Sequence, residues 1–116
     1  MTQNYKVIGS GKVDVVVEAG LGSCLAEWLP MARRLSKKGK TVLLYERFGI
    51  NLSAPAKEAR TPKQIAGELY KLLKKVPHKE KVILLAHSQG GLYAQQFCRL
   101  YPELVEKLVY CIIDIW

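Results

Sequence analysis

The chain has 116 residues, enough for one domain with a buried core and too few for two. Apolar residues make up 49% of it and charged residues 24%, a balance that excludes an intrinsically disordered chain. No apolar run approaches the roughly 20 residues that span a bilayer, and the N-terminus lacks a signal-peptide pattern. We therefore expect a cytoplasmic protein with no membrane span.

The net charge of +8 raises the question of nucleic-acid binding. Most Lys and Arg residues, however, fall at predicted helix ends and in loops, where they complement the helix dipole and solvate the surface. No aromatic–basic interleaving accompanies them, so we predict no nucleic-acid partner.

The three cysteines, Cys24, Cys98 and Cys111, have no metal-like spacing, and their odd number argues against a disulfide framework. The sequence also contains no phosphate-binding loop and no dinucleotide-binding fingerprint. We therefore predict no metal and no cofactor.

Short β-rich runs alternate with amphipathic helices along most of the chain. In chain order, we expect strands at 5–8, 13–17, 41–45, 82–86 and 108–113, and helices at 25–35, 61–76 and 92–101. The link Gly9-Ser10-Gly11-Lys12 predicts a β-hairpin between the first two strands. Thr61-Pro62-Lys63-Gln64 is typical of a capping box with proline at the first helical position. This order predicts an α/β fold, a mostly parallel sheet with helices on both faces.

The stretch around Ser88 carries the strongest chemical signal. It follows the unbroken apolar run Val82–Ala86, which is typical of a strand buried on both faces. A sharp strand-to-helix turn strains its central residue and needs small neighbours, and here Ala86 precedes Ser88 by two residues while Gly90 follows it by two. This pattern predicts a nucleophile elbow. The alternative is that Ser88 only caps the helix that follows.

Two further loops are expected at the same edge of the sheet. Segments 18–23 and 46–53 also follow predicted strands, and the carboxyl ends of parallel strands meet at one edge, where sites form. The first loop is rich in small residues, although it can also be read as an ordinary strand–helix turn with Ser23 as the cap.

Together these loops resemble the N-terminal half of an α/β-hydrolase-fold enzyme. The similarity rests on Glu18-Ala19-Gly20-Leu21-Gly22, on Tyr45-Glu46-Arg47-Phe48-Gly49-Ile50-Asn51-Leu52-Ser53, and on Ala86-His87-Ser88-Gln89-Gly90-Gly91. The sequence departs from the family pattern in having Ala19 where many members have His, Glu46 in place of Asp, and Asn51 in place of a second Gly.

The resemblance implies acyl-transfer chemistry. Ser88 would attack the carbonyl of a small acyl substrate, by default a carboxylic ester. The backbone N–H groups of Leu21 and Gln89 would hold the oxyanion, and Gly20 and Gly22 would let the backbone approach the substrate.

A base for the serine is missing from the expected site. We expect His87 to support the elbow with its side chain turned away from the serine hydroxyl, and His78 to lie at the opposite edge of the sheet. The catalytic His would then come from outside this chain. Asp114 is a candidate acid or a structural residue, and Glu46 and Arg47 are expected to form a turn-stabilising ion pair.

We therefore expect residues 1–116 to be the N-terminal portion of an α/β-hydrolase domain that lacks the C-terminal strands and the cap. A complementary C-terminal segment or chain would complete it and cover the apolar outer strand at 108–113. Two classes of function remain open. One is a serine hydrolase or its fragment, and the other is a non-catalytic binding or interaction module of the same fold.

Overall fold

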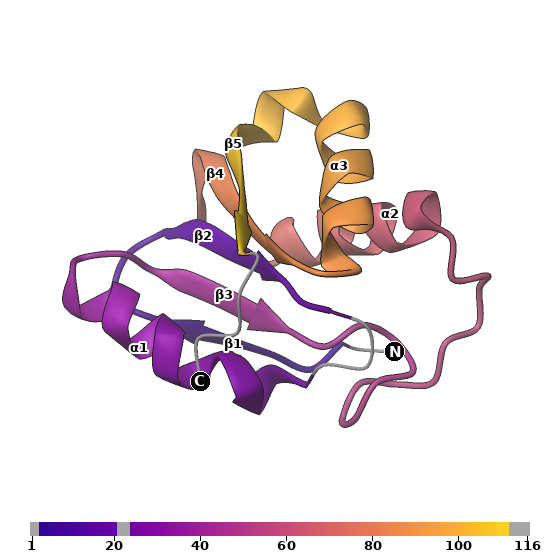
Figure 1. The fold of residues 1–116 in the computed structure, drawn as a ribbon, viewed down its shortest axis with the longest axis horizontal. Helices are drawn as coiled ribbons and strands as arrows, with labels where there is room; N and C mark the ends of the chain where they lie inside the picture. Colours follow the sequence, from indigo (N-terminus) through magenta and orange to yellow (C-terminus); the bar gives the residue numbers. More distant parts are fainter. Residues whose placement is uncertain (1–2, 21–23, 112–116) are drawn as a thin grey trace.

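Five strands form one sheet in the order β1-β3-β2-β4-β5, shown in Figure 1. The computed structural model describes residues 3–20 and 24–111. The strands are β1 (Tyr5–Ile8), β2 (Val13–Glu18), β3 (Val42–Tyr45), β4 (His78–His87) and β5 (Val105–Cys111). All neighbouring strands run parallel except β1, which is antiparallel to β3. The mostly parallel sheet predicted from the sequence is confirmed.

The predicted hairpin between the first two strands is wrong. β1 pairs with β3, from Tyr5 opposite Tyr45 to Ile8 opposite Val42, so that β3 lies between β1 and β2. Every residue of β2 is buried, and such a strand needs a partner on each side. β1 has an exposed first half and suits the edge of the sheet.

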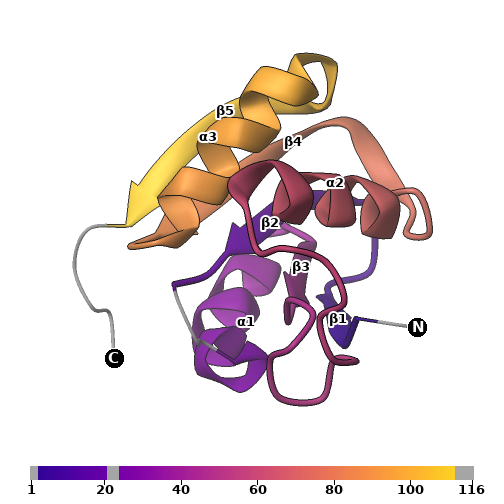
Figure 2. The same ribbon diagram turned by 90° about the vertical axis from the view of Figure 1, so that its right-hand side faces the viewer.

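Helices cover both faces of the sheet, as predicted. They are the short 3₁₀ turn η1 (Leu25–Trp28), α1 (Leu29–Lys37), α2 (Pro62–Leu73), α3 (Gly90–Leu100) and the 3₁₀ turn η2 (Pro102–Leu104). Figure 2 shows α1 on one side of the sheet and α2 with α3 on the other. From Val15 onward the side chains of β2 alternate between the two faces, with Val16 in the α2–α3 core and Val15 and Val17 in the α1 core. An irregularity in the register between Val13 and Val15 lets Val13 join Val16 in the α2–α3 core.

The capping box predicted at the start of α2 is half formed. The Thr61 hydroxyl accepts a hydrogen bond of 3.1 Å from the backbone N–H of Gln64. The Gln64 side chain turns instead to the buried Glu68, to which Arg60 also donates two hydrogen bonds. The capping box is therefore incomplete, because the Gln64 side chain donates to Glu68 and does not accept from the backbone N–H of Thr61.

The last two strands are longer or earlier than predicted. β4 begins at His78, four residues before the expected start, and β5 begins at Val105. β5 is the outer strand of the sheet and exposes Val109 and Tyr110. Within residues 3–20 and 24–111, no helix is long and apolar enough to cross a membrane.

Candidate active site

Ser88 lies at the apex of the turn between β4 and α3. Its φ is +53°, a left-handed conformation that is strained for a residue with a Cβ, and its side chain is exposed. α3 begins at Gly90, and the N-cap position belongs to Gln89, whose side chain makes no capping bond. The geometry is therefore that of a sharp turn that presents a hydroxyl to solvent.

Gly90 allows the start of α3 to lie directly on the end of β2. A Cβ on Gly90 would come within 2.0 Å of the Glu18 carbonyl oxygen and 2.5 Å of the Ala19 carbonyl oxygen. On the other side of this contact, a Cβ on Gly20 would lie 3.5 Å from the Cβ of Ser88. The loop after β2 and the turn after β4 therefore meet, as the topology predicts for the carboxyl ends of parallel strands.

An open pocket of about 440 Å³ adjoins Ser88 and is lined by His87, Ser88, Tyr110 and Cys111. Its walls come from two paired strands, since Ala86 lies opposite Tyr110 and His87 opposite Cys111. Ala86, two residues before Ser88, is fully buried in the α2–α3 core.

The two histidines lie in different parts of the sheet. The His87 ring packs edge-on against Trp28, with ring centroids 5.6 Å apart, and Trp28 is buried in the α1 core. His78 pairs with Val13 at the amino ends of β4 and β2, at the edge opposite Ser88. Its Nδ1 lies 2.7 Å from the Lys79 carbonyl oxygen. His78 is therefore remote from the serine.

A buried charged cluster, which we name the Glu18 cluster, lies beneath the elbow. It consists of Glu18, Tyr45, Arg47 and Tyr93. Arg47 Nη2 lies 2.5 Å from Glu18 Oε1, and the Tyr45 hydroxyl donates to the same carboxylate at 2.6 Å. The Arg47 guanidinium also lies over the Tyr93 ring of α3, 4.4 Å from its centroid. The cluster therefore links β2, β3 and α3.

Arg47 also holds the loop that follows β2. Its guanidinium donates to the carbonyl of Ala19 at 2.5 Å and to that of Gly20 at 3.4 Å. These bonds satisfy backbone oxygens that lie beside the elbow, where an unpaired buried carbonyl would be destabilising. The position of the 18–20 segment is thus determined by Arg47.

The predicted ion pair between Glu46 and Arg47 is wrong, because each side chain has other partners. Glu46 accepts hydrogen bonds from the side chains of Asn4 and Asn51 and from the backbone N–H groups of Leu25 and Leu52, at 2.8–3.2 Å. Successive residues of an extended segment point to opposite faces, so Glu46 and Arg47 serve different loops. Asn51, with φ of +44°, adopts the left-handed conformation that asparagine tolerates.

The pKa values of these groups reflect their burial and their partners. Burial raises the pKa of Glu18, and the Arg47 charge and the hydrogen bonds from Tyr45 and Arg47 offset only part of this effect. Burial also raises the pKa of Tyr45 well above its ordinary value, and the Glu18 charge adds to this. Burial alone would lower the pKa of Arg47, but the electrostatic interactions with Tyr45 and Glu18 and the hydrogen bonds to Glu18 outweigh it and raise the pKa. The guanidinium therefore remains a fixed cation beneath the elbow.

Several predicted site residues lie outside the described part of the chain. These are Leu21, Gly22, Ser23 and Asp114. Among the described residues, no group of three or more His, Cys, Asp or Glu side chains could hold a metal ion.

The Glu18 cluster was not predicted from the sequence, although a signal was available. Glu18 follows the three consecutive valines Val15–Val17 at the end of a strand, and Arg47 follows the neighbouring strand by two residues. Opposite charges just past two neighbouring parallel strands meet at the same edge and can pair. The missing information was which strands are neighbours.

The fold is that of the α/β-hydrolase family. The family model described as "alpha/beta hydrolase fold" matches residues 15–112, and the chain belongs to this family. Among its relatives is a proline iminopeptidase of Saccharolobus solfataricus, 33% identical over 107 residues, which are 90% of this chain and 34% of the relative. Another is a putative carbamate hydrolase, RutD, of Stutzerimonas stutzeri, 32% identical over 91% of this chain and 41% of the relative.

Solved structures show the same fold. A thermophilic esterase from Thermogutta terrifontis superposes with a TM-score of 0.84 at 22% identity, covering 94% of this chain and 39% of the esterase. A marine microorganism esterase gives a TM-score of 0.81 over 93% of this chain and 40% of the esterase. The chain thus spans about a third to two fifths of the length of the relatives described here.

Replacement of Gly90 by Ala tests the close approach of α3 to β2. A methyl group there would collide with backbone carbonyls that cannot move aside, so Gly90→Ala should lower the free energy of unfolding by at least about 3 kcal/mol. The matched control is Gly67→Ala in the interior of α2, where the nearest atom to the new Cβ is the Tyr101 hydroxyl at 3.9 Å. This change should be stabilising by about 0.5–1 kcal/mol. Urea unfolding followed by circular dichroism measures both, and equal stabilities would contradict the packing described.

The Glu46 carboxylate should make stability depend on pH in the acid range. Burial alone would raise its pKa, but hydrogen bonds from Asn51, Leu25, Asn4 and Leu52 outweigh this and hold the pKa below its ordinary value of 4.5. Its stabilising contribution is therefore present above pH 4.5 and is lost as the pH falls through the lowered folded-state pKa.

The measurement compares Glu46→Gln with the native chain from neutral to acid pH. We expect the variant to be less stable by about 1–3 kcal/mol near neutral pH, with the difference shrinking as the pH falls below the ordinary Glu value. The exposed Glu103 provides the control, since Glu103→Gln should leave stability nearly unchanged at every pH. A Glu46→Gln deficit that is constant with pH would show that the charge plays no part.

Proposed function

We propose that this chain is the nucleophile-bearing part of a serine hydrolase that acts on a carboxylic ester or a related acyl substrate. The observation that carries the proposal is the strained, exposed conformation of Ser88 beside a pocket. Strain of this kind persists only where the surrounding structure holds it, and it is concentrated at functional sites. A residue that merely capped α3 would need neither the positive φ nor the close contact at Gly90.

The proposed reaction uses the Ser88 Oγ as the nucleophile. As Oγ bonds to the substrate carbonyl carbon, its proton passes to a histidine base, which then protonates the departing alcohol. Water next hydrolyses the acyl-serine to release the acid and regenerate Ser88. In this proposal the backbone N–H of Gln89, at the positive end of α3, would donate to the oxyanion.

Arg47 has a positioning role in this proposal. A planar trans peptide directs its C=O and its N–H to opposite sides. A Gly20 carbonyl held by Arg47 would therefore fix the direction of the next N–H group, the donor proposed at Leu21. The Glu18 cluster would in this way support the oxyanion hole without contacting the substrate.

The base and the acid are proposed to come from a complementary C-terminal segment or chain. His78 lies at the wrong edge of the sheet, and the His87 ring packs against Trp28. The outer strand β5 exposes apolar side chains, and the chain covers 34% and 41% of two curated relatives. Both observations favour a larger assembly in which the remaining strands carry the missing groups.

The alternative is a binding or interaction module of the same fold that does not turn over substrate. It is favoured by the places of the two histidines, because His78 lies at the opposite edge of the sheet and the His87 ring packs against Trp28. The strained serine argues against it, because a binding pocket gains nothing from that conformation.

Labelling with a fluorophosphonate probe separates the two functions. The probe should modify Ser88 in the purified protein together with any chain that copurifies with it, since an activated serine attacks phosphorus as it attacks a carbonyl. Ser88→Ala should abolish labelling, whereas Ser53→Ala, at a buried serine in another loop, should retain it. Intact-mass measurement identifies the modified chain and any second chain. An unlabelled Ser88 in every preparation, with or without a partner, would exclude the hydrolase.

Removal of Arg47 should separate stability from activity. Arg47→Met leaves the Glu18 carboxylate buried without its cation and should lower the free energy of unfolding by about 3–5 kcal/mol. The double variant Glu18→Leu/Arg47→Met should recover part of this loss, because no unpaired charge then remains in the Glu18 cluster. Its rate of fluorophosphonate labelling should stay reduced, because the Ala19 and Gly20 carbonyls have still lost their donor. Full recovery of the labelling rate in the double variant would limit Arg47 to a role in stability.

A further inference from the structure

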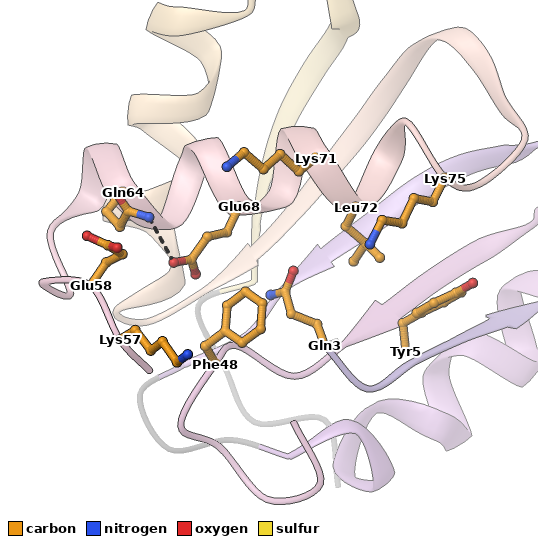
Figure 3. A pocket seen from close by; sticks show the side chains of 10 residues that line it. All are labelled: Gln3, Tyr5, Phe48, Lys57, Glu58, Gln64, Glu68, Lys71, Leu72 and Lys75. Atoms are coloured by element: carbon orange, nitrogen blue, oxygen red, sulfur yellow. Dashed lines mark hydrogen bonds between the residues drawn. The ribbon is translucent and has the colours of Figure 1, made fainter. Parts of the chain in front are cut away.

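A second pocket lies between the start of β1, the loops after β3 and helix α2, as Figure 3 shows. Its volume is about 450 Å³, within the range of small-molecule sites. Phe48 and Leu72 form its apolar wall, and Lys57, Lys71 and Lys75 stand around it. It is separate from the Ser88 pocket, because β2 and β3 lie between β4 and the β1 edge of the sheet.

Gln3 supplies this pocket with a hydrogen-bond donor that lacks a partner. Its side chain is 9% exposed, and its buried Nε2 has no hydrogen-bond partner among the residues that the structure describes. Figure 3 shows the Gln3 amide among the residues that line the pocket, with its nitrogen on the side of Phe48. Native structures pair nearly all buried polar groups, so an unsatisfied one requires an explanation. A bound ligand whose oxygen accepts a hydrogen bond from this amide would explain why Nε2 has no partner within the protein.

The position of Gln3 is held by its neighbour. The Asn4 backbone N–H donates to the Ser53 hydroxyl at 2.7 Å, and the Asn4 side chain donates to Glu46 at 2.8 Å. The residue that carries the unpaired donor is therefore attached to a fixed point of the loop after β3. The backbone next to Gln3 is thus held in place, which lowers the entropic cost of ordering this residue when a ligand binds.

The charges around the pocket favour an anion. Three lysines line it, against two acidic residues, Glu58 and Glu68. Glu68 is already neutralised, since Arg60 donates to both of its oxygens at 2.8 Å and 2.9 Å. The lysines are exposed, so their ammonium groups can turn toward a bound group.

From these observations the structure assigns to this pocket the binding of a small organic carboxylate with an aromatic or aliphatic body. The body lies against Phe48 and Leu72, where it buries apolar surface. One carboxylate oxygen accepts the hydrogen bond of Gln3 Nε2, and the other faces the lysines. This site does not depend on the function proposed for Ser88.

The test is a titration of the full chain with 3-phenylpropionate, followed by ¹⁵N NMR, with 3-phenylpropionamide as the uncharged control ligand. Resonances of Gln3, its side-chain amide and Leu72 should shift with the carboxylate, and the amide should bind about tenfold more weakly. Added salt should weaken binding of the carboxylate and leave that of the amide unchanged. No shift at these positions, or equal affinity for the two ligands, would overturn the assignment.

Variants locate the contacts. Gln3→Glu keeps the size of the side chain and replaces the donor with a repelling carboxylate, so it should reduce the affinity at least about tenfold. Lys75→Gln should reduce it a few-fold, while Lys37→Gln on α1, outside the pocket, should have no effect. If Gln3→Glu fails to fold, two comparisons still test the assignment. They are the affinity of Lys75→Gln against that of Lys37→Gln, and the affinity for the carboxylate against that for the amide ligand.

Binding is also measured in Ser88→Ala. The expected affinity is that of the native chain, and the Gln3 resonances should shift as before. A loss of binding in this variant would place the carboxylate at the serine and overturn the second site. Fluorophosphonate labelling has no bearing on this readout, so either proposal can fail alone.

Discussion

The contact between the end of β2 and the start of α3 is the constraint on which the site depends. It exists because Gly90 has no side chain and because Arg47 holds the Ala19 and Gly20 carbonyls from the other side. Placing a charge there requires a partner, since burial of an isolated ion is prohibitively unfavourable. Glu18 is that partner. Its carboxylate also accepts a hydrogen bond from the Tyr45 hydroxyl, which fixes its position. A buried ion pair is thus used to shape a loop.

The strain at Ser88 follows from the same packing. A left-handed conformation at a residue with a Cβ costs on the order of 1–3 kcal/mol and would relax if the turn were free. It is not free, because β4 continues into the turn from one side and α3 is seated on β2 from the other. The pairing of β4 with both β2 and β5 fixes the strand end in register. The exposed hydroxyl is therefore a consequence of backbone geometry set by buried residues.

Most of the fold could be predicted because its elements differ in local pattern. Apolar runs gave the strands, helical periodicity gave the helices, and Gly90 with Ser88 indicated the elbow. What could not be predicted is which strands are neighbours: the link Gly9–Lys12 suits a hairpin, yet the full burial of β2 places β3 between the two strands. Because the strand order was not known, the pairing of Glu18 with Arg47 could not be predicted either. The unpaired amide of Gln3 could not be predicted for another reason, since a buried amide without a partner has no sequence signature.

Three contacts that shape the elbow lie within the described part of this chain, and they bear on the proposal that the base comes from another segment. Gly90 meets β2, Arg47 meets the loop after β2, and Tyr93 of α3 packs on Arg47. None of these contacts needs a further strand. The geometry of the nucleophile and that of the proposed base would then be specified by separate segments, which meet only when the β5 side of the sheet is extended. On this view, a complementary segment would supply proton transfer to a serine whose strained conformation is already in place.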